Sequence, residues 1–431
     1  MALPVRHVRW RVRLVGVVVA VLGLGLGTAC GSGHKAEWQG SGADNTSPPP
    51  GAAQLVISPA AGAKDISPAD PVKVDVVNGT LEAVTLKNPT GKIVQGEFDT
   101  DKKSWHSTEA LGYNKAYTLA AVGIGEDGQR HETSQTFTTV KPNEFTLPYL
   151  RANGAMLLDG GTFGVGQAIV VWFDEPIKDR AAAERTLTVT TDPPVVGAWA
   201  WTGDREVHWR PQVYWPAGTK VKVEAKVYGR HFGDGLYGQE DRSASFTIGR
   251  SKIAIADSKT HRMKIYIDGQ QITKINGRDV TAGIPISMGK NSGERGANGQ
   301  WVDYRTQSGP HVVTTKKPDP YKMTSASYGI TDPKSPNFYE TLIKRPVRIS
   351  NDGEFVHLAD WNISQHGVTN TSHGCINVAP AYIYWFYDTF GAGDIVDVKN
   401  TGRSVNTNKV GVNGWDWIVP WAQWQKLSAL P

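Results

Sequence analysis

The chain has 431 residues, 46 Lys and Arg against 41 Asp and Glu, and two cysteines. This length is too great for one ordinary core and predicts several domains. Four of the five excess positive charges are arginines among the first 13 residues. The rest of the chain is therefore almost neutral, and there is no electrostatic case for nucleic acid as a partner. Two cysteines also exclude a disulfide framework.

Residues 1–30 predict a signal peptide. Arginines at 6, 9, 11 and 13 precede an apolar run, and the small residues of "GTAC" lead to Cys30. This is a lipobox pattern, although Gly27 stands where Leu or Val is usual. We expect Cys30 to be lipidated and to anchor the exported protein on the outer face of the cytoplasmic membrane, facing the cell wall. The alternatives are an ordinary cleaved signal and an uncleaved anchor.

A flexible linker and two β modules follow. Residues 31–53 are rich in Gly, Ser and Pro, as in a tether. Residues 54–141 and 142–250 carry short alternating strands with frequent turns, which predicts two tandem Ig-like β-sandwiches. We interpret both as spacers. The loop 233–241 mixes acids and glycines but lacks the spacing of a strong Ca²⁺ loop, which favours a plain turn.

The last two segments are a third β-rich region and a short tail. Residues 251–398 are interrupted by one predicted helix, which begins near Pro380, ends near Gly391 and has an apolar stripe typical of a core-facing helix. The fold class expected is therefore mainly β. Residues 399–431 hold four closely spaced tryptophans, and packing onto a domain is favoured over a sugar-binding surface.

Cys375 in "TNTSHGCINVAP" carries most of the functional information. A metal site would need three or four ligands, and no second ligand pair is present. A buried structural thiol would have apolar neighbours, whereas Ser372, Gly374 and Asn377 surround this one. A nucleophile needs a base and oxyanion donors, and amides ahead of a helix supply the latter. His357, at a predicted strand end, is a better base than the adjacent His373.

The motif "SHGCIN" at 372–377, preceded by His357 and fifteen intervening residues, resembles the signature of the L,D-transpeptidases, whose catalytic domain is of the YkuD type. The likeness extends to "ISMGKNS", "SASYGI", "NFYET" and "WFYD". With two Ig-like domains, a catalytic domain and a Trp-rich extension, the mature chain resembles mycobacterial and actinobacterial lipoprotein members of this family.

The resemblance implies a role for each matched residue. Cys375 is the nucleophile, and His357 is the general base and acid, oriented by the backbone carbonyl of Leu358. The amides of His373, Gly374 and Cys375 form the oxyanion site. His366 lies within the fifteen-residue interval, but the spacing favours His357. The positions that match substrate contacts or the lid over the pocket are Tyr339, Gly353, Asn377, Met323, Tyr328 and Ser372.

The resemblance further implies an acyltransferase that forms 3→3 cross-links between peptidoglycan tetrapeptide stems through a cysteine thioester, with release of D-alanine. Carbapenem β-lactams are expected to acylate Cys375. Neither a metal nor an organic cofactor is implied. Three alternatives stay open: an L,D-carboxypeptidase on the same scaffold, a non-catalytic lipoprotein that binds the cell wall, and a cysteine protease.

Overall fold

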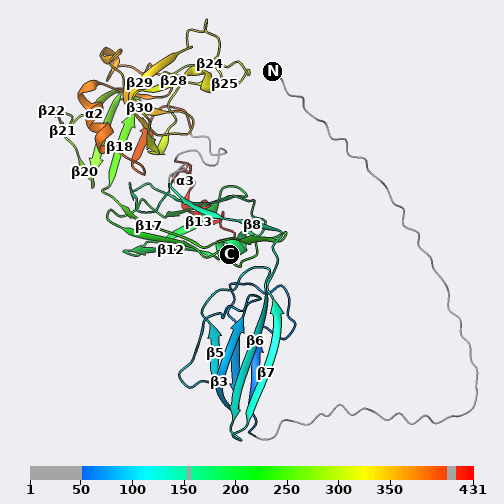
Figure 1. Cartoon of the computed structure of the whole chain (residues 1–431). Coiled ribbons are helices and arrows are strands. Elements are labelled where there is room, and N and C mark those ends of the chain that lie inside the picture. The colour runs from blue at the N-terminus through cyan, green and yellow to red at the C-terminus, as the bar shows by residue number, and fades with distance from the viewer. Residues whose placement is uncertain (1–50, 153–156, 405–413) are drawn as a thin grey trace, which may run out of the picture. The chain divides into compact units, whose positions relative to one another are not determined.

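A computed structural model describes residues 51–152, 157–404 and 414–431. The predicted signal peptide, Cys30 and most of the linker lie outside these ranges. The mainly β fold is confirmed, as Figure 1 shows. In the ranges described, no helix has both the length and the apolar character needed to cross a membrane.

The first sandwich has two sheets over one core. Ala53 belongs to this core, so the predicted linker is wrong at its last residues, because the methyl group of Ala53 packs inside the first sandwich. Asn78, with a φ of +59°, turns the chain from one sheet into the other. One sheet contains β1 (Gln54–Ser58), β2 (Lys73–Val77), β5 (Ser104–Ser107) and β4 (Gly96–Phe98), and the other contains β3 (Gly79–Lys87), β6 (Ala116–Gly125) and β7 (Arg130–Thr138).

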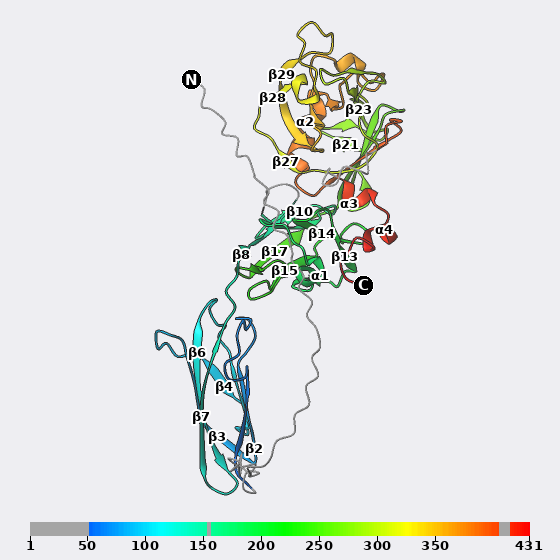
Figure 2. The same cartoon turned by 90° about the vertical axis from the view of Figure 1, so that its right-hand side faces the viewer.

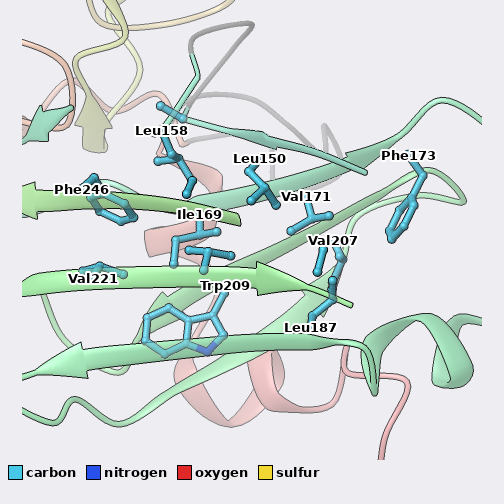
Figure 3. Close-up of a cluster of buried hydrophobic side chains, with 14 of the residues drawn as sticks. Leu150, Leu158, Ile169, Val171, Phe173, Leu187, Val207, Trp209, Val221 and Phe246 are labelled. Atoms are coloured by element: carbon cyan, nitrogen blue, oxygen red, sulfur yellow. The ribbon is translucent and has the colours of Figure 1, made fainter. Parts of the chain in front are cut away.

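The second sandwich is built in the same way and has a larger aromatic core. Figure 3 shows side chains from strands of both sheets gathered in this core. The loop 233–241 begins as a plain turn, in which the amide of Leu236 donates to the carbonyl of Gly233 at 2.8 Å, but residues 236–238 then form a short strand. One sheet contains β10 (Thr162–Phe163), β17 (Arg242–Ile248), β15 (Lys220–Ala225) and β12 (Leu187–Asp192), and the other contains β13 (Gly197–Trp201), β14 (Glu206–Pro211), β11 (Ile169–Phe173) and β9 (Pro148–Arg151); β8 (Glu144–Thr146), β16 (Leu236–Gly238) and α1 (Arg180–Glu184) complete the module.

An 11-stranded sheet dominates the third region within the described residues. Its main path contains β26 (Gly309–Val312), β32 (Ile395–Lys399), β18 (Lys252–Asp257), β19 (Arg262–Ile267), β23 (Ile284–Ser287), β31 (Ile376–Val378), β30 (Phe355–Leu358), β29 (Glu340–Arg348) and β27 (Thr315–Lys316). β20 (Gln270–Gln271) and β28 (Tyr321–Thr324) pair at its side, and β21 (Lys274–Ile275) with β22 (Arg278–Asp279) and β24 (Gly293–Arg295) with β25 (Trp301–Asp303) form separate hairpins. The 3-10 turns are η1 (Ser325–Tyr328) and η2 (Ile363–Gln365).

The predicted helix is α2 (Pro380–Thr389), which directly follows β31. Ile383, Phe386 and Phe390 are completely buried, and Tyr387 packs against the same core as a half-buried side chain. The apolar stripe is therefore confirmed as a core-facing surface. Because α2 packs on β29 and β30, it fixes the strands that carry His357 and the residues after Cys375.

The tryptophan-rich tail packs against the second sandwich. Trp415 and Trp424 are buried, and α4 (Trp421–Gln425) lies on β13, as Figure 2 shows; α3 (Trp415–Ile418) precedes it. Arg210 of β14 lies 4.6 Å from the centre of the Trp424 ring and donates to the carbonyl of Val419 at 2.8 Å. The interpretation of this tail as a packed segment is confirmed.

A buried histidine also joins this tail to the sandwich. His208 of β14 contacts Asp416 through Nδ1 at 2.8 Å and Glu206 through Nε2 at 2.7 Å. Burial alone would lower the pKa of His208, but these two carboxylates outweigh it and raise the pKa to about 10. The junction therefore contains an imidazolium held between two acids.

Candidate active site

Parallel pairing of β30 with β31 brings His357 and Cys375 together. His357 is opposite Asn377 in the register, and Cys375 lies two residues before Asn377. Because residues two apart on a strand point to the same face, all three side chains face one side of the sheet. They line a cavity of about 570 Å³, which we call the thiol cavity. Its lining consists of Met323, Tyr339, Thr341, Ile343, His357, Trp361, Asn362, Gln365, Thr371, Ser372, His373, Cys375 and Asn377.

The orientation of His357 suits a base. Its Nδ1–H donates to the carbonyl of Leu358 at 2.8 Å, which leaves the lone pair of Nε2 available as a proton acceptor. The ring of Trp361 stacks on the imidazole with 5.8 Å between ring centres. Burial lowers the pKa of His357 to about 4, so the imidazole is neutral at neutral pH.

The thiol of Cys375 is also neutral. Its side chain is buried and donates weakly to the carbonyl of Gly353, with 3.9 Å between sulfur and oxygen. Burial raises the pKa of the thiol to about 12, and a hydrogen bond from the backbone of Phe355 offsets this only in part. The site at rest therefore contains a thiol and an imidazole instead of an ion pair.

The residues before the cysteine form a tight loop, Ser372–Cys375, which we call the nucleophile loop. Ser372 Oγ donates to the carbonyl of Cys375 at 2.6 Å and accepts from the amide of Gly374 at 3.1 Å. Gly374 has a φ of +131°, a conformation that favours glycine. Of the amides predicted for the oxyanion site, that of Gly374 is engaged with Ser372.

The two other histidines near Cys375 have partners of their own. His373 lies between the rings of Tyr304 and Tyr339, at 4.6 and 5.2 Å between ring centres, and its Nε2 is 3.3 Å from the ammonium of Lys290. Burial, with a smaller effect of Lys290, lowers the pKa of His373 to about 4. His366 contacts Asn362 through Nε2 and lines neither cavity described here. Neither histidine takes the place of His357 beside the sulfur.

The predicted substrate contacts divide between two cavities. Met323, Tyr339, Ser372 and Asn377 line the thiol cavity. Asn377 Oδ1 is buried, and no hydrogen-bond partner for it exists in the described part of the protein, so a bound donor would satisfy it. Tyr328 belongs to η1 by its backbone, but its side chain lies outside the described structure.

A second cavity of about 580 Å³ adjoins the first, and we call it the polar cleft. It shares Met323 and His373 with the thiol cavity and includes the predicted Gly353. Its lining also contains Asn298, Gln300, Trp301, Val302, Asp303, Gln307, Tyr321, Lys322, Thr324, Ser327, Gly329, Arg348, Asn351, Asp352, Glu354, Phe355, Gly374 and Arg403. Over residues 51–152, 157–404 and 414–431, no three His, Cys, Asp or Glu side chains are grouped so that they could hold a metal ion.

Sequence reasoning missed Trp361, Lys290 and Glu354. Trp361 follows His357 by four residues, and an aromatic residue so close to the predicted base was a usable signal. Lys290 belongs to the quoted "ISMGKNS", but its contact with His373 joins segments 83 residues apart. No local pattern shows that contact.

Comparison with known proteins identifies two regions. The family of bacterial Ig domains matches residues 63–231, and that of L,D-transpeptidase catalytic domains matches residues 251–398. L,D-transpeptidase 2 of Mycobacterium tuberculosis is 39% identical over 87% of this chain and 85% of its own length. L,D-transpeptidase 5 of the same species is 38% identical over 89% of this chain and 78% of its own length.

Solved structures of L,D-transpeptidases also match part of the chain. A structure of an LD transpeptidase in complex with imipenem is 28% identical and covers 58% of this chain and 99% of its own, with a TM-score of 0.46. A structure of L,D-transpeptidase 3 from Mycobacterium tuberculosis with a faropenem-derived adduct is also 28% identical and covers 58% of this chain and 98% of its own, with a TM-score of 0.45.

Proposed function

The chain belongs to the L,D-transpeptidase family and is an acyltransferase of that class, and from this premise we propose that Cys375 and His357 perform the acyl transfer. The supporting observation is their position in one cavity, with His357 Nδ1 bound to the carbonyl of Leu358 and Nε2 left as the acceptor. The proposed donor is a peptidoglycan tetrapeptide stem, and the product is a 3→3 cross-link.

The first half-reaction forms a thioester. As the sulfur of Cys375 attacks the carbonyl carbon of the diaminopimelate residue, the thiol proton moves to Nε2 of His357. The tetrahedral intermediate then collapses, the bond to the terminal D-alanine breaks, and the imidazolium donates its proton to the departing amine. Because both groups are neutral at rest, the proton transfer and the attack are coupled.

The second half-reaction resolves the thioester. The side-chain amine of a neighbouring stem attacks the thioester carbonyl and loses a proton to His357. The sulfur leaves as a thiolate and recovers that proton from the imidazolium. Water in place of the amine gives a tripeptide monomer, which is the L,D-carboxypeptidase outcome.

The nucleophile loop would stabilise the oxyanion through the amides of His373, Gly374 and Cys375. Amides directed at the developing charge are each worth about 3–4 kcal/mol in acyl transfer. The bond from the Gly374 amide to Ser372 Oγ must break before that amide can serve.

Substrate binding would use the remaining predicted residues. The unpartnered Oδ1 of Asn377 would accept a hydrogen bond from the donor stem. Tyr339 and Met323 would contact the stem in the thiol cavity, with Gly353 on the side of the polar cleft. Tyr328 and Ser372 complete the proposed set.

Carbapenems would acylate the same sulfur, because their lactam carbonyl is an activated acyl group that a thiol attacks in the same way. One of the LD transpeptidase structures compared above was solved in complex with imipenem. We expect one adduct for each chain, on Cys375.

The membrane location also belongs to the proposal. Cleavage before Cys30 and its lipidation would place the enzyme on the outer face of the cytoplasmic membrane, with the segment after Cys30 as a tether. Mass spectrometry of the protein from the membrane fraction should then show Cys30 as its first residue, carrying acyl chains. An unmodified Cys30, or a leader that is still attached, would contradict lipid anchoring.

Product analysis tests the function as a whole. The purified chain is incubated with a disaccharide-tetrapeptide, and the products are identified by mass. We expect a dimer that lacks one D-alanine, and no dimer from Cys375→Ala. A tripeptide monomer as the sole product would instead establish a hydrolase. Full activity of the Cys375→Ala variant would refute the proposed nucleophile, and absence of any product from the wild type would restore the wall-binding alternative.

A further inference from the structure

Glu354 is a buried carboxylate beside the nucleophile that the proposed mechanism does not use. Its exposed fraction is 5%. In sequence it stands between Gly353 and Phe355, and the backbones of both contact the sulfur of Cys375. The carbonyl of Gly353 accepts from the thiol, and the amide of Phe355 donates to the sulfur. The position of Glu354 therefore determines the position of both backbone groups.

Two other segments hold this carboxylate in place. Its Oε1 accepts from the amide of Gln307 at 2.9 Å, and its Oε2 is 3.3 Å from Nε2 of His311 on β26. Nη1 of Arg403, which follows β32, lies 4.0 Å from Oε1. The other nitrogen of His311 faces the carbonyl of Gly309 at 3.0 Å. Both ring nitrogens of His311 therefore face acceptor oxygens, and these two contacts hold the ring in place.

Arg403 is itself fixed by the backbone of the neighbouring loop. Its Nη1 donates to the carbonyls of Asp303 and Arg305, at 3.1 and 2.7 Å. The guanidinium therefore cannot move toward Glu354 without breaking these bonds, and its charge stays near the carboxylate. A buried acid with partners from three positions along the chain has little freedom.

The side chain of Glu354 also packs against the nucleophile loop. A Cβ atom added at Gly374 would lie 3.7 Å from Cγ and 4.0 Å from Oε1 of Glu354. The titratable groups around the sulfur are thus Glu354 ahead of β30, His357 on β30 and His373 in the loop, whereas His311 and Arg403 face the carboxylate. Burial is the main cause of the raised pKa of Cys375, and the negative charge of Glu354 is a further cause.

We propose that Glu354 is a positioning residue for Cys375: its anchored carboxylate fixes the backbone that contacts the sulfur, and its charge keeps the sulfur as a thiol until His357 accepts the proton. Arg403 tunes this effect, because its guanidinium neutralises part of the charge. The inference rests on the proposed role of Cys375 as the nucleophile.

The electrostatic part predicts opposite effects for two substitutions. Glu354→Gln keeps the shape and removes the charge, so alkylation of Cys375 by iodoacetamide at pH 8 should become about threefold or more faster. Arg403→Met leaves the carboxylate less neutralised, so alkylation should become slower by a similar factor. A residue with only a packing role would change both rates in the same direction.

The positioning part predicts a separate effect on turnover. Glu354→Ala removes the anchor and should lower kcat with the tetrapeptide donor about tenfold or more, whereas KM changes by less than about threefold. Glu354→Gln should retain most of kcat. Glu132→Gln is the matched control, because Glu132 is an exposed acid on β7 in the first sandwich, and it should leave both readouts unchanged.

The outcomes separate this inference from the proposed function. If Cys375→Ala keeps transpeptidation, the proposed function fails. If Cys375→Ala is inactive but Glu354→Gln and Arg403→Met shift alkylation in the same direction, or Glu354→Ala keeps full kcat, the role of Glu354 is refuted and the proposed function stands. Should Glu354→Ala fail to fold, the alkylation rates of the other two variants, measured on folded protein, decide.

Discussion

Replacement of the proposed base, His357→Gln, tests whether His357 and Cys375 are both neutral at rest. The glutamine amide can still donate to the carbonyl of Leu358, but it cannot accept a proton. With the pKa of Cys375 raised to about 12 by burial, only about 10⁻⁵ of the sulfur is thiolate at pH 7. The variant must react through this small fraction, whereas the wild type uses its imidazole on the whole population.

We therefore expect acylation by imipenem at pH 7 to slow by about 10² to 10⁴ in His357→Gln, the usual range for loss of a general base. The rate of the variant should then rise about tenfold for each pH unit between 7 and 10, since the thiolate fraction rises in that proportion. In the wild type, burial lowers the pKa of His357 to about 4. Its rate should be level above about pH 5 and fall only below that.

Rapid-mixing absorbance of the β-lactam, with intact-protein mass as a check, measures both rates. His106→Gln is the matched control, because His106 is a half-exposed residue of β5 in the first sandwich, and it should keep the pH profile of the wild type. If His357→Gln reacts within tenfold of the wild type at pH 7, or shows no slope with pH, the reasoning is refuted.

Three further predictions concern stability and binding. Asp416 and Glu206 raise the pKa of His208 to about 10 despite burial. The charged His208 therefore stabilises the folded state fully below about pH 6.5, and this stabilisation is lost as the pH rises through 10. Between pH 7 and 10, the melting temperature should fall by less in His208→Gln than in the wild type. Trp424→Ala removes a fully buried indole and should lower the unfolding free energy by about 3–5 kcal/mol in urea titration; a loss below 1 kcal/mol would show that the tail contributes little. Asn377→Ala should raise KM for the tetrapeptide about tenfold through one lost hydrogen bond, and an unchanged KM would remove Asn377 from the binding site.

The sequence was most informative where spacing decides the chemistry. The interval between His357 and "SHGC" predicts a base delivered by a neighbouring strand, and β30 lies beside β31 in parallel register. Alternation of apolar and polar residues was sufficient to predict the two sandwiches, because each strand buries one face. The apolar stripe of α2 could be predicted for the same reason, because one face of that helix is buried.

Contacts between distant segments were beyond such reasoning. His208 and Asp416 are 208 residues apart, and Glu354 meets Arg403 only because β26, β30 and β32 belong to one sheet. The state of the thiol was also not readable. A histidine and a cysteine in one motif do not show whether the two groups are ionised, whereas burial of both groups favours their neutral forms.

The most direct test of the account is the mass of the intact protein after rapid acid quenching of a reaction with the tetrapeptide donor alone. The account predicts a transient adduct equal to the donor less D-alanine, attached to Cys375 and absent from Cys375→Ala. Product formation with no such adduct, or with an adduct on another residue, would contradict acyl transfer through this sulfur.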